Sequence, residues 1–85
     1  NTATGIETLK SNTEGSYNSA LGYESLYTNT TGDLNTASGY KALLSNSSGD
    51  SNTAVGYLSL KSNTSYSNTA VGYATMENNT NGYEN

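Results

Sequence analysis

The chain has 85 residues and a net charge of −4 at pH 7, from seven acidic and three basic side chains, and it contains no cysteine. The excess of acidic side chains leaves no basic patch for phosphates, so we expect no nucleic-acid partner. The absence of cysteine excludes disulfides and thiolate metal sites. No apolar run is long enough to span a bilayer, so we expect no membrane insertion.

A repeat organises the whole chain. Its units comprise residues 1–17, 18–34, 35–51, 52–67 and 68–84. The apolar content is low enough for a disordered linker, but apolar residues return at the same position of every unit, which predicts stacked repeats. Because Asn85 opens a further unit, we expect residues 1–85 to form one repeat segment of a longer fibre protein.

Each unit begins with a short uncharged stretch that is typical of a strand. It comprises residues 1–6, 18–23, 35–40, 52–57 and 68–73. The following stretch, such as residues 40–46, fits a second strand or one helical turn, and we favour a strand. Turn sequences follow at residues 29–32 and 46–49. The pattern predicts an all-β fold, a parallel β-solenoid of five coils stacked about 4.8 Å apart.

Two columns of residues are the predicted core, at positions 6 and 9 counted from the leading asparagine of each unit. They are Tyr23, Tyr40, Tyr57 and Tyr73, and Leu9, Leu26, Leu43, Leu60 and Met76. No charged residue falls on positions 1–6, 8 or 9 of any unit, and buried charge is costly. We therefore expect positions 1–6 to lie away from water, with one strand face on the solenoid core and the other against a neighbouring chain.

Asparagine also recurs at two positions of every unit. Position 1 holds Asn1, Asn18, Asn35, Asn52 and Asn68, and position 12 holds Asn12, Asn29, Asn46, Asn63 and Asn79. Stacked amides can bond from coil to coil, which predicts two structural ladders. The alternative is N-glycosylation at the acceptor sequences of Asn29, Asn46, Asn63 and Asn78. Residues 12–14 keep the asparagine without the acceptor sequence, which favours the ladder.

The charged side chains predict no catalytic, cofactor or metal site. Stacking would place Glu7 beside Glu24 and Asp33 beside Asp50, about 5 Å apart. Both columns lie at charge-tolerant positions that we expect to be exposed, where nothing nearby would raise one pKa above the other. We interpret them as a solvated face and expect no enzyme. Stacking would also pair Glu24 with Lys41, and Lys61 with Glu77.

The repeats resemble the head repeats of trimeric autotransporter adhesins and the repeats of tail-fibre-like surface proteins. The match is best at residues 52–60 and 68–76, which carry Asn-Thr-Ala-Val-Gly-Tyr. The resemblance implies a left-handed parallel β-roll, a homotrimer, and an extracellular place on a cell surface or a virion fibre. It also implies binding to a surface glycan or a matrix ligand.

These observations lead us to expect a structural and adhesive module of an extracellular fibre or adhesin head, with further copies along the fibre. One alternative is an ice- or carbohydrate-binding solenoid that uses a hydroxyl column. This column contains Thr2, Ser19, Thr36, Thr53 and Thr69. Another alternative is a glycosylated, self-assembling filament.

Overall fold

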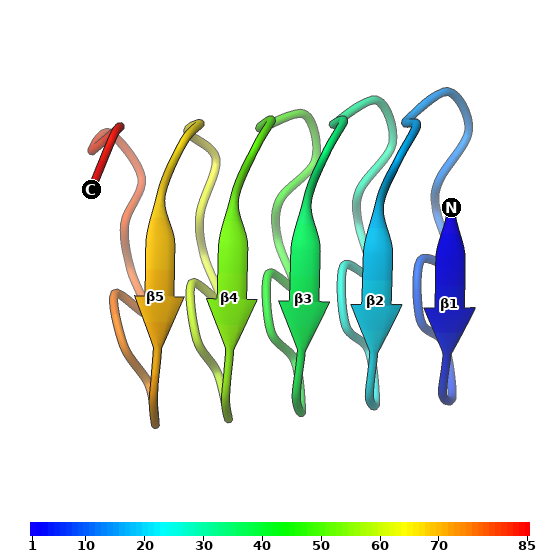
Figure 1. Ribbon diagram of the computed structural model, residues 1–85, viewed down its shortest axis with the longest axis horizontal. Coiled ribbons are helices and arrows are strands. Elements are labelled where there is room, and N and C mark those ends of the chain that lie inside the picture. Colours follow the sequence, from blue (N-terminus) through cyan, green and yellow to red (C-terminus); the bar gives the residue numbers. More distant parts are fainter.

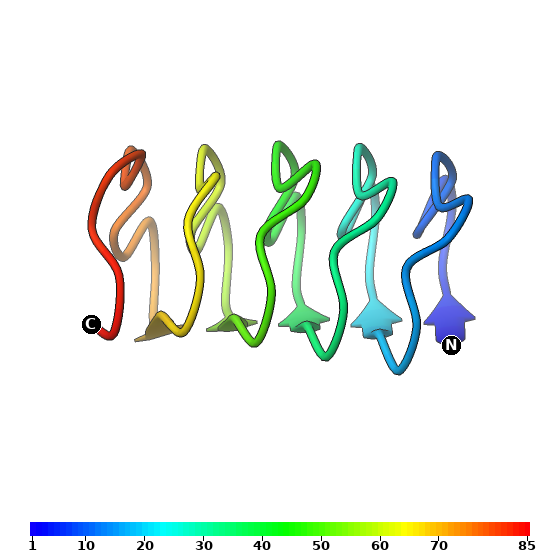
Figure 2. The ribbon, with the colours of Figure 1, turned by 90° about the horizontal axis from the view of Figure 1, so that it is seen from above.

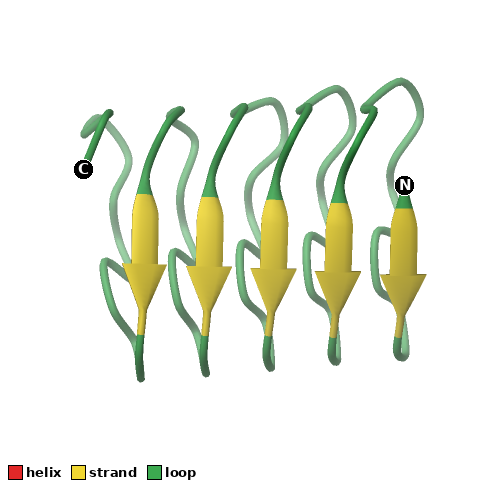
Figure 3. Cartoon of the chain, in the orientation of Figure 1, coloured by secondary structure: helices red, strands yellow, loops and turns green.

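The computed structural model describes residues 1–85 and shows five coils stacked along one axis, one for each repeat unit (Figures 1 and 2). The strands are β1 (Thr2–Thr4), β2 (Ser19–Leu21), β3 (Thr36–Ser38), β4 (Thr53–Val55) and β5 (Thr69–Val71). They form a single parallel sheet in sequence order. The rest of each coil is turn and loop, without helix (Figure 3). The predicted parallel β-solenoid is therefore confirmed.

Equivalent residues of successive units lie side by side in the sheet. Ala37 of β3, for example, pairs with Ala20 of β2 and with Ala54 of β4. The fourth unit is one residue shorter, yet its strand keeps this register, since Ala54 pairs with Ala70. In Figure 1 the strands descend in front, the chain rises behind them and the stack advances from right to left, which makes the coil left-handed.

The stretch that follows each strand is not a second strand, so our expectation for positions 6–12 was wrong. In the third coil, Lys41 and Leu43 have φ of 55° and 52°, whereas extended chain has negative φ. The segment still bonds from coil to coil, because the N–H of Leu43 donates to the carbonyl of Ser59 at 3.1 Å. Left-handed residues thus bend the chain back over the sheet without ending its pairing between coils.

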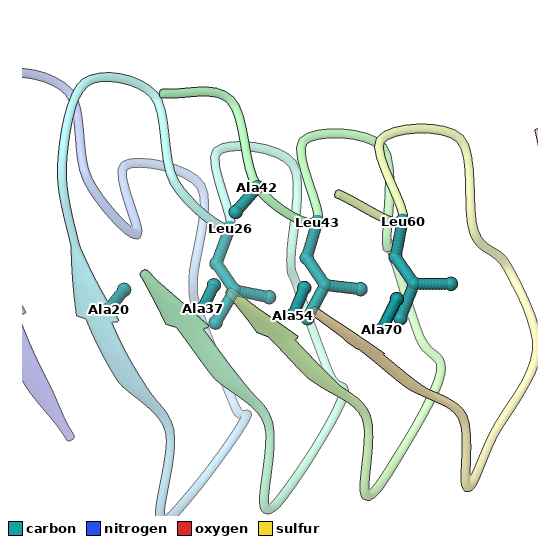
Figure 4. Packing of buried hydrophobic residues seen from close by; sticks show 8 residues of the cluster. All are labelled: Ala20, Leu26, Ala37, Ala42, Leu43, Ala54, Leu60 and Ala70. Atoms are coloured by element: carbon teal, nitrogen blue, oxygen red, sulfur yellow. The ribbon is translucent and has the colours of Figure 1, made fainter. Parts of the chain in front are cut away.

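The core is a narrow layer between the sheet and this bent segment. Ala20, Ala37, Ala54 and Ala70 of the strands face Leu26, Leu43 and Leu60 of the bent segment, together with Ala42 (Figure 4). The three leucines are fully buried, and Leu9 and Met76 pack against them from the two end coils. Because alanine is small, the two layers approach closely, and the shortest extent of the molecule is 15 Å.

The glycine at position 5 turns the chain out of each strand. Gly39 has a φ of 136°, a conformation open almost only to glycine. A β-carbon there would also lie 2.7 Å from the carbonyl carbon of Gly56 in the next coil. Two requirements, the dihedral angle and the close approach of two backbones, therefore fix this residue type in the repeat.

Candidate functional site

The asparagine at position 1 bonds its own coil to the next one. Asn35 donates from Nδ2 to the carbonyl of Gly49 at 2.8 Å and accepts the backbone N–H of Asn52 on Oδ1 at 2.9 Å. Equivalent bonds occur at Asn1, Asn18, Asn52 and Asn68. This ladder therefore alternates between side chain and backbone, and it satisfies amide groups that burial would otherwise leave unpaired.

The asparagines at position 12 form a ladder in which the bonds between coils join side chain to side chain. Asn46 donates from Nδ2 to Oδ1 of Asn29 at 3.2 Å and to the carbonyl of Gly49 at 2.8 Å, and its Oδ1 accepts from Asn63 at 3.3 Å. The series runs without a break through Asn12, Asn29, Asn46, Asn63 and Asn79. Both predicted ladders are present in the structure.

The two ladders converge on one carbonyl group in each coil, which we name the clamp carbonyl. It belongs to Gly15, Gly32, Gly49, Ser65 and Gly82. These residues lie in the turn sequences at the end of each unit, yet Gly15, Gly32 and Gly49 are buried. A β-carbon on Gly32 would lie 2.5 Å from Oδ1 of Asn29. Close packing against the ladder therefore explains these glycines.

The fourth unit lacks this glycine, and Ser65 supplies its clamp carbonyl. That carbonyl accepts from Nδ2 of Asn52 and of Asn63, both at 2.8 Å, and the hydroxyl of Ser65 donates to Thr80 at 2.9 Å. The deletion thus removes a residue from the turn while every bond of the clamp is kept. This is the physical reason that the shorter unit stays in register.

At three of the four acceptor sequences, the asparagine side chain is a ladder residue and is not accessible for glycosylation. Asn29, Asn46 and Asn63 are completely buried, and Asn29 uses Nδ2 for two bonds, to Asn12 and to Gly32. A glycan on Nδ2 would replace one of these amide hydrogens and would need space that the stack does not have. Glycosylation at these three positions is therefore incompatible with the folded coil, whereas Asn78 is exposed.

In a host that glycosylates secreted proteins, we expect the folded chain to carry glycan at Asn78 and not at the three buried acceptors. Mass spectrometry of the peptides checks this directly. The variant Thr80→Ala removes the acceptor sequence of Asn78 and serves as the control, so it should leave the folded chain without glycan. Glycan on Asn46 in the folded fraction would show that the ladder opens more readily than its hydrogen bonds imply.

The outer face of the sheet is a regular surface, and we define it as the side chains at positions 2, 4 and 6 of all five units. None of them is charged, yet Val71, Leu21 and Val55 are exposed by 65%, 54% and 37%. In the single chain these three positions therefore face outward, and our expectation that a neighbouring chain covers this face stays a prediction. Alternation along a strand sends only positions 1 and 3 inward, and the chain by itself has nothing to cover the other face.

The position-6 tyrosines also lie outside, contrary to the core assignment. Tyr23, Tyr40 and Tyr57 are about two-fifths exposed, and Tyr73 is 79% exposed. Their rings stack on one another along the axis, with centroids 5.4, 5.1 and 5.0 Å apart and planes within 10° of parallel. The tyrosine at position 6 therefore recurs because its ring contacts the ring of the next coil, and not because it is buried in the core. Tyr66 and Tyr83 form a second stacked pair at 5.2 Å.

Replacing Tyr40 by alanine should remove two of these stacking contacts. Aromatic pairs contribute about 0.5–1.5 kcal/mol each beyond their buried area, so we expect a loss of about 1–3 kcal/mol. Chemical denaturation measures the loss, and near-ultraviolet circular dichroism should weaken in parallel. Tyr17→Ala is the matched control, because Tyr17 is 79% exposed and has no stacking partner. Equal losses in both variants would contradict a role for stacking.

Charged side chains sit at the margins of the stack. The predicted pairs between adjacent coils are present, with Glu24 to Lys41 at 3.4 Å and Lys61 to Glu77 at 3.9 Å. The pKa of Lys41 is raised, first by a hydrogen bond with the side chain of Tyr40 and then by the charge of Glu24. The pKa of Tyr23 is raised chiefly by its hydrogen bond to Glu24. These groups form a small network at the surface, where the side chains of Lys41 and Glu24 are partly exposed, and surface pairs contribute little to stability.

One structural column, at position 8, and the bonding role of the acidic column at Asp33 and Asp50 went unnoticed in the sequence. The residues at position 8 are small in every unit, and Ser25, Ala42 and Ser59 are fully buried. Ser25 donates from its hydroxyl to the carbonyl of Gly39 in the next coil at 3.2 Å. The acidic column also bonds backbone groups, since Oδ1 of Asp33 accepts the N–H of Ser16 at 2.7 Å. The signal for position 8 was its small, uncharged residue in all five units.

The surface has no pocket, and no three metal-ligating side chains lie together. No helix in the structure could cross a membrane. Comparison of the chain with protein families, with curated proteins and with solved structures finds no match. The class that the structure defines is therefore a parallel β-solenoid with asparagine ladders.

Proposed function

We propose that the chain is a structural and adhesive module of an extracellular fibre or adhesin head, in which the stack is a rigid shaft and its surface provides attachment. The observation that carries this proposal is the unbroken bonding between coils. Backbone groups bond on the sheet side and on the bent side, and both amide ladders run the length of the stack. Such a column resists bending and can be extended by adding coils.

The resemblance to trimeric adhesin heads and tail-fibre repeats supports the same function, together with a place on a cell surface or a virion. The uncharged outer face suits an association of three chains, since exposed apolar surface of this kind commonly marks an interface. A sheet of five strands, read from position 2 to position 6, offers roughly 24 × 13 Å, or about 300 Å², to a neighbour. A stable interface needs about 800 Å² from each partner, so trimers should strengthen as coils are added.

Two experiments test the two parts of this proposal. Sedimentation of the chain and of a tandem duplicate should show a trimer that forms at lower concentration for the duplicate, and monomers at all concentrations for both would contradict the trimer. Beads that carry the chain should be retained on surfaces coated with matrix proteins or glycans. Val55→Glu, on the outer face, should abolish retention, whereas Ser48→Glu should not, because the first unit carries Glu14 at that position. Absence of retention on every surface would overturn the adhesive part.

A second candidate is ice binding, and the structure supplies one observation in its favour. The hydroxyl column at position 2 lies on the exposed side of the sheet, with Thr2, Ser19, Thr36 and Thr69 open to solvent and Thr53 partly so. Parallel strands space these groups evenly along the axis, at about 4.8 Å. We expect thermal hysteresis if this face orders water into ice, and its loss in Thr36→Glu. No hysteresis in the unaltered chain would remove this candidate.

Binding of a carbohydrate by the same face would have to use hydroxyl groups. The stacked tyrosine rings at position 6 cover one another's faces. A sugar that binds along this column would therefore contact only ring edges and phenol oxygens. Aromatic platforms for ligands instead present open ring faces, and in this column only the last ring, Tyr73, is largely exposed. A glycan partner is therefore expected to depend on Thr36 and Thr53 more than on Tyr40, which paired alanine variants on a glycan-coated surface can test.

A further inference from the structure

One dipeptide in the last coil combines an exposed amide side chain with an unhindered neighbour. Asn81 precedes Gly82, and this is the one Asn-Gly sequence in the chain. Asn81 is exposed, and its side chain forms no hydrogen bond. The N–H of Gly82 donates to no acceptor. The following nitrogen is therefore free, and glycine has no β-carbon to block its approach to the side-chain amide.

We propose that the Asn81–Gly82 bond is a site of spontaneous deamidation that releases the clamp of the last coil. The backbone nitrogen of Gly82 loses its proton to solvent and bonds to Cγ of Asn81. The Cγ–Nδ2 bond breaks, and the leaving nitrogen takes a proton from solvent and departs as ammonia, so that the chain closes into a five-membered succinimide. Water then opens the ring at either carbonyl and leaves aspartate or isoaspartate. No oxidant, metal or enzyme is needed, since water is the one co-reactant.

The ladder asparagines are protected from the same reaction. Each is followed by threonine or serine, whose β-carbon crowds the attacking nitrogen. The interior ones are also buried, and their amides are held by hydrogen bonds. Asn46, for example, is completely buried and is bonded to Asn29, Gly49 and Asn63. The ladder positions are thus protected, and the exposed Asn78 is followed by Asn79, whose β-carbon crowds the attacking nitrogen in the same way.

That turn carries a clamp carbonyl, which gives the modification its consequence. The carbonyl oxygen of Gly82 accepts Nδ2 of Asn68 and Nδ2 of Asn79, both at 2.9 Å. Isoaspartate inserts the former β-carbon of residue 81 into the main chain directly before Gly82 and adds a negative charge. The carbonyl must then move, and both ladders lose their common acceptor in this coil while the coils before it keep theirs.

The test is incubation of the full chain at neutral and at mildly alkaline pH, followed by mass spectrometry that distinguishes aspartate from isoaspartate. We expect conversion at Asn81 alone, faster at the higher pH because the attacking nitrogen must be deprotonated. In heavy-oxygen water the new carboxyl group should carry one heavy oxygen atom. In nuclear magnetic resonance spectra, the side-chain amide signals of Asn68 and Asn79 should shift as conversion proceeds, while those of Asn29 and Asn46 stay in place.

Two variants control this experiment. Asn81→Ser reproduces the Ser48–Gly49 sequence of the third unit and should abolish conversion without loss of the fold. Glu14→Asn places a second Asn-Gly sequence in the first unit, where the N–H of Gly15 is bonded to Thr30 at 3.1 Å, and it should convert several-fold more slowly than Asn81. Equal rates at both sites, or an unaltered Asn81 under conditions that convert the same sequence in a short peptide, would overturn the proposal. Conversion without a shift of the Asn68 and Asn79 signals would overturn the release of the clamp.

Discussion

Gly39→Ala is expected to destabilise the stack by about 2–6 kcal/mol, the sum of the strain of a left-handed alanine and of overpacking against the next coil. Gly39 has a φ of 136°, and a β-carbon there would meet the backbone of Gly56. Neither obstacle can be relieved by turning a side chain, since both belong to the main chain. The midpoint of chemical denaturation, followed by circular dichroism, measures the loss.

The matched control for this variant is Ser48→Ala, at an exposed turn position whose side chain makes no hydrogen bond. Exposed substitutions of this kind change stability by less than about 0.5 kcal/mol. A Gly39→Ala chain with the denaturation midpoint of the control would show that the coils can move apart at β3 and β4 at little cost. Close contact between the two backbones would then not be needed for stability.

Asn46→Ala is expected to cost a similar amount, for a different reason. The change leaves Oδ1 of Asn29 without a donor and one amide hydrogen of Asn63 without an acceptor, both inside the stack. Each buried polar group left unpaired costs about 1–3 kcal/mol, so the loss should be about 2–6 kcal/mol. Chemical denaturation measures it, and hydrogen exchange should quicken in the third and fourth coils first.

Asn78→Ala provides the comparison, because Asn78 neighbours the ladder in sequence but is exposed and bonds to nothing. It should leave the midpoint within about 0.5 kcal/mol of the unaltered chain. If Asn46→Ala were equally mild, water would have to enter the ladder and replace the missing amide. Buried waters of that kind need a polar and sufficiently large space, and exchange of the Asn29 amide would reveal one.

The two variants probe different parts of one cooperative array. Each coil bonds only to its neighbours, so stability in such arrays is close to a sum of coil and interface terms. Loss of one interface near the middle, at Gly39 or at Asn46, should therefore divide the stack into two short pieces. Short pieces have few interfaces left, which is why central positions should be more sensitive than the end coils.

The repeat itself determined the architecture. Regular return of alanine at position 3 and leucine at position 9 predicted stacked coils, because only stacking places equivalent small and large residues in common columns. The ladders followed from the same logic, since an asparagine such as Asn12 persists where the acceptor sequence for glycosylation is absent. The adjacent charge pair of Glu24 and Lys41 was also predictable, because register fixes neighbours across coils.

Two features were decided by the tertiary structure. The segment after each strand bends through residues in the left-handed conformation, such as Lys41 and Leu43. Their residue types do not predict this bend, because non-glycine residues rarely adopt that conformation on their own. Burial of Leu43 and bonding to the next coil hold it there. The tyrosine column was misplaced for a related reason. A large residue that recurs in every unit indicates that its copies contact one another, but the contact can lie inside a core or on an outer face. Here the bend turns Tyr40 outward. Its ring is covered by the tyrosine rings of the adjacent coils and not by the core.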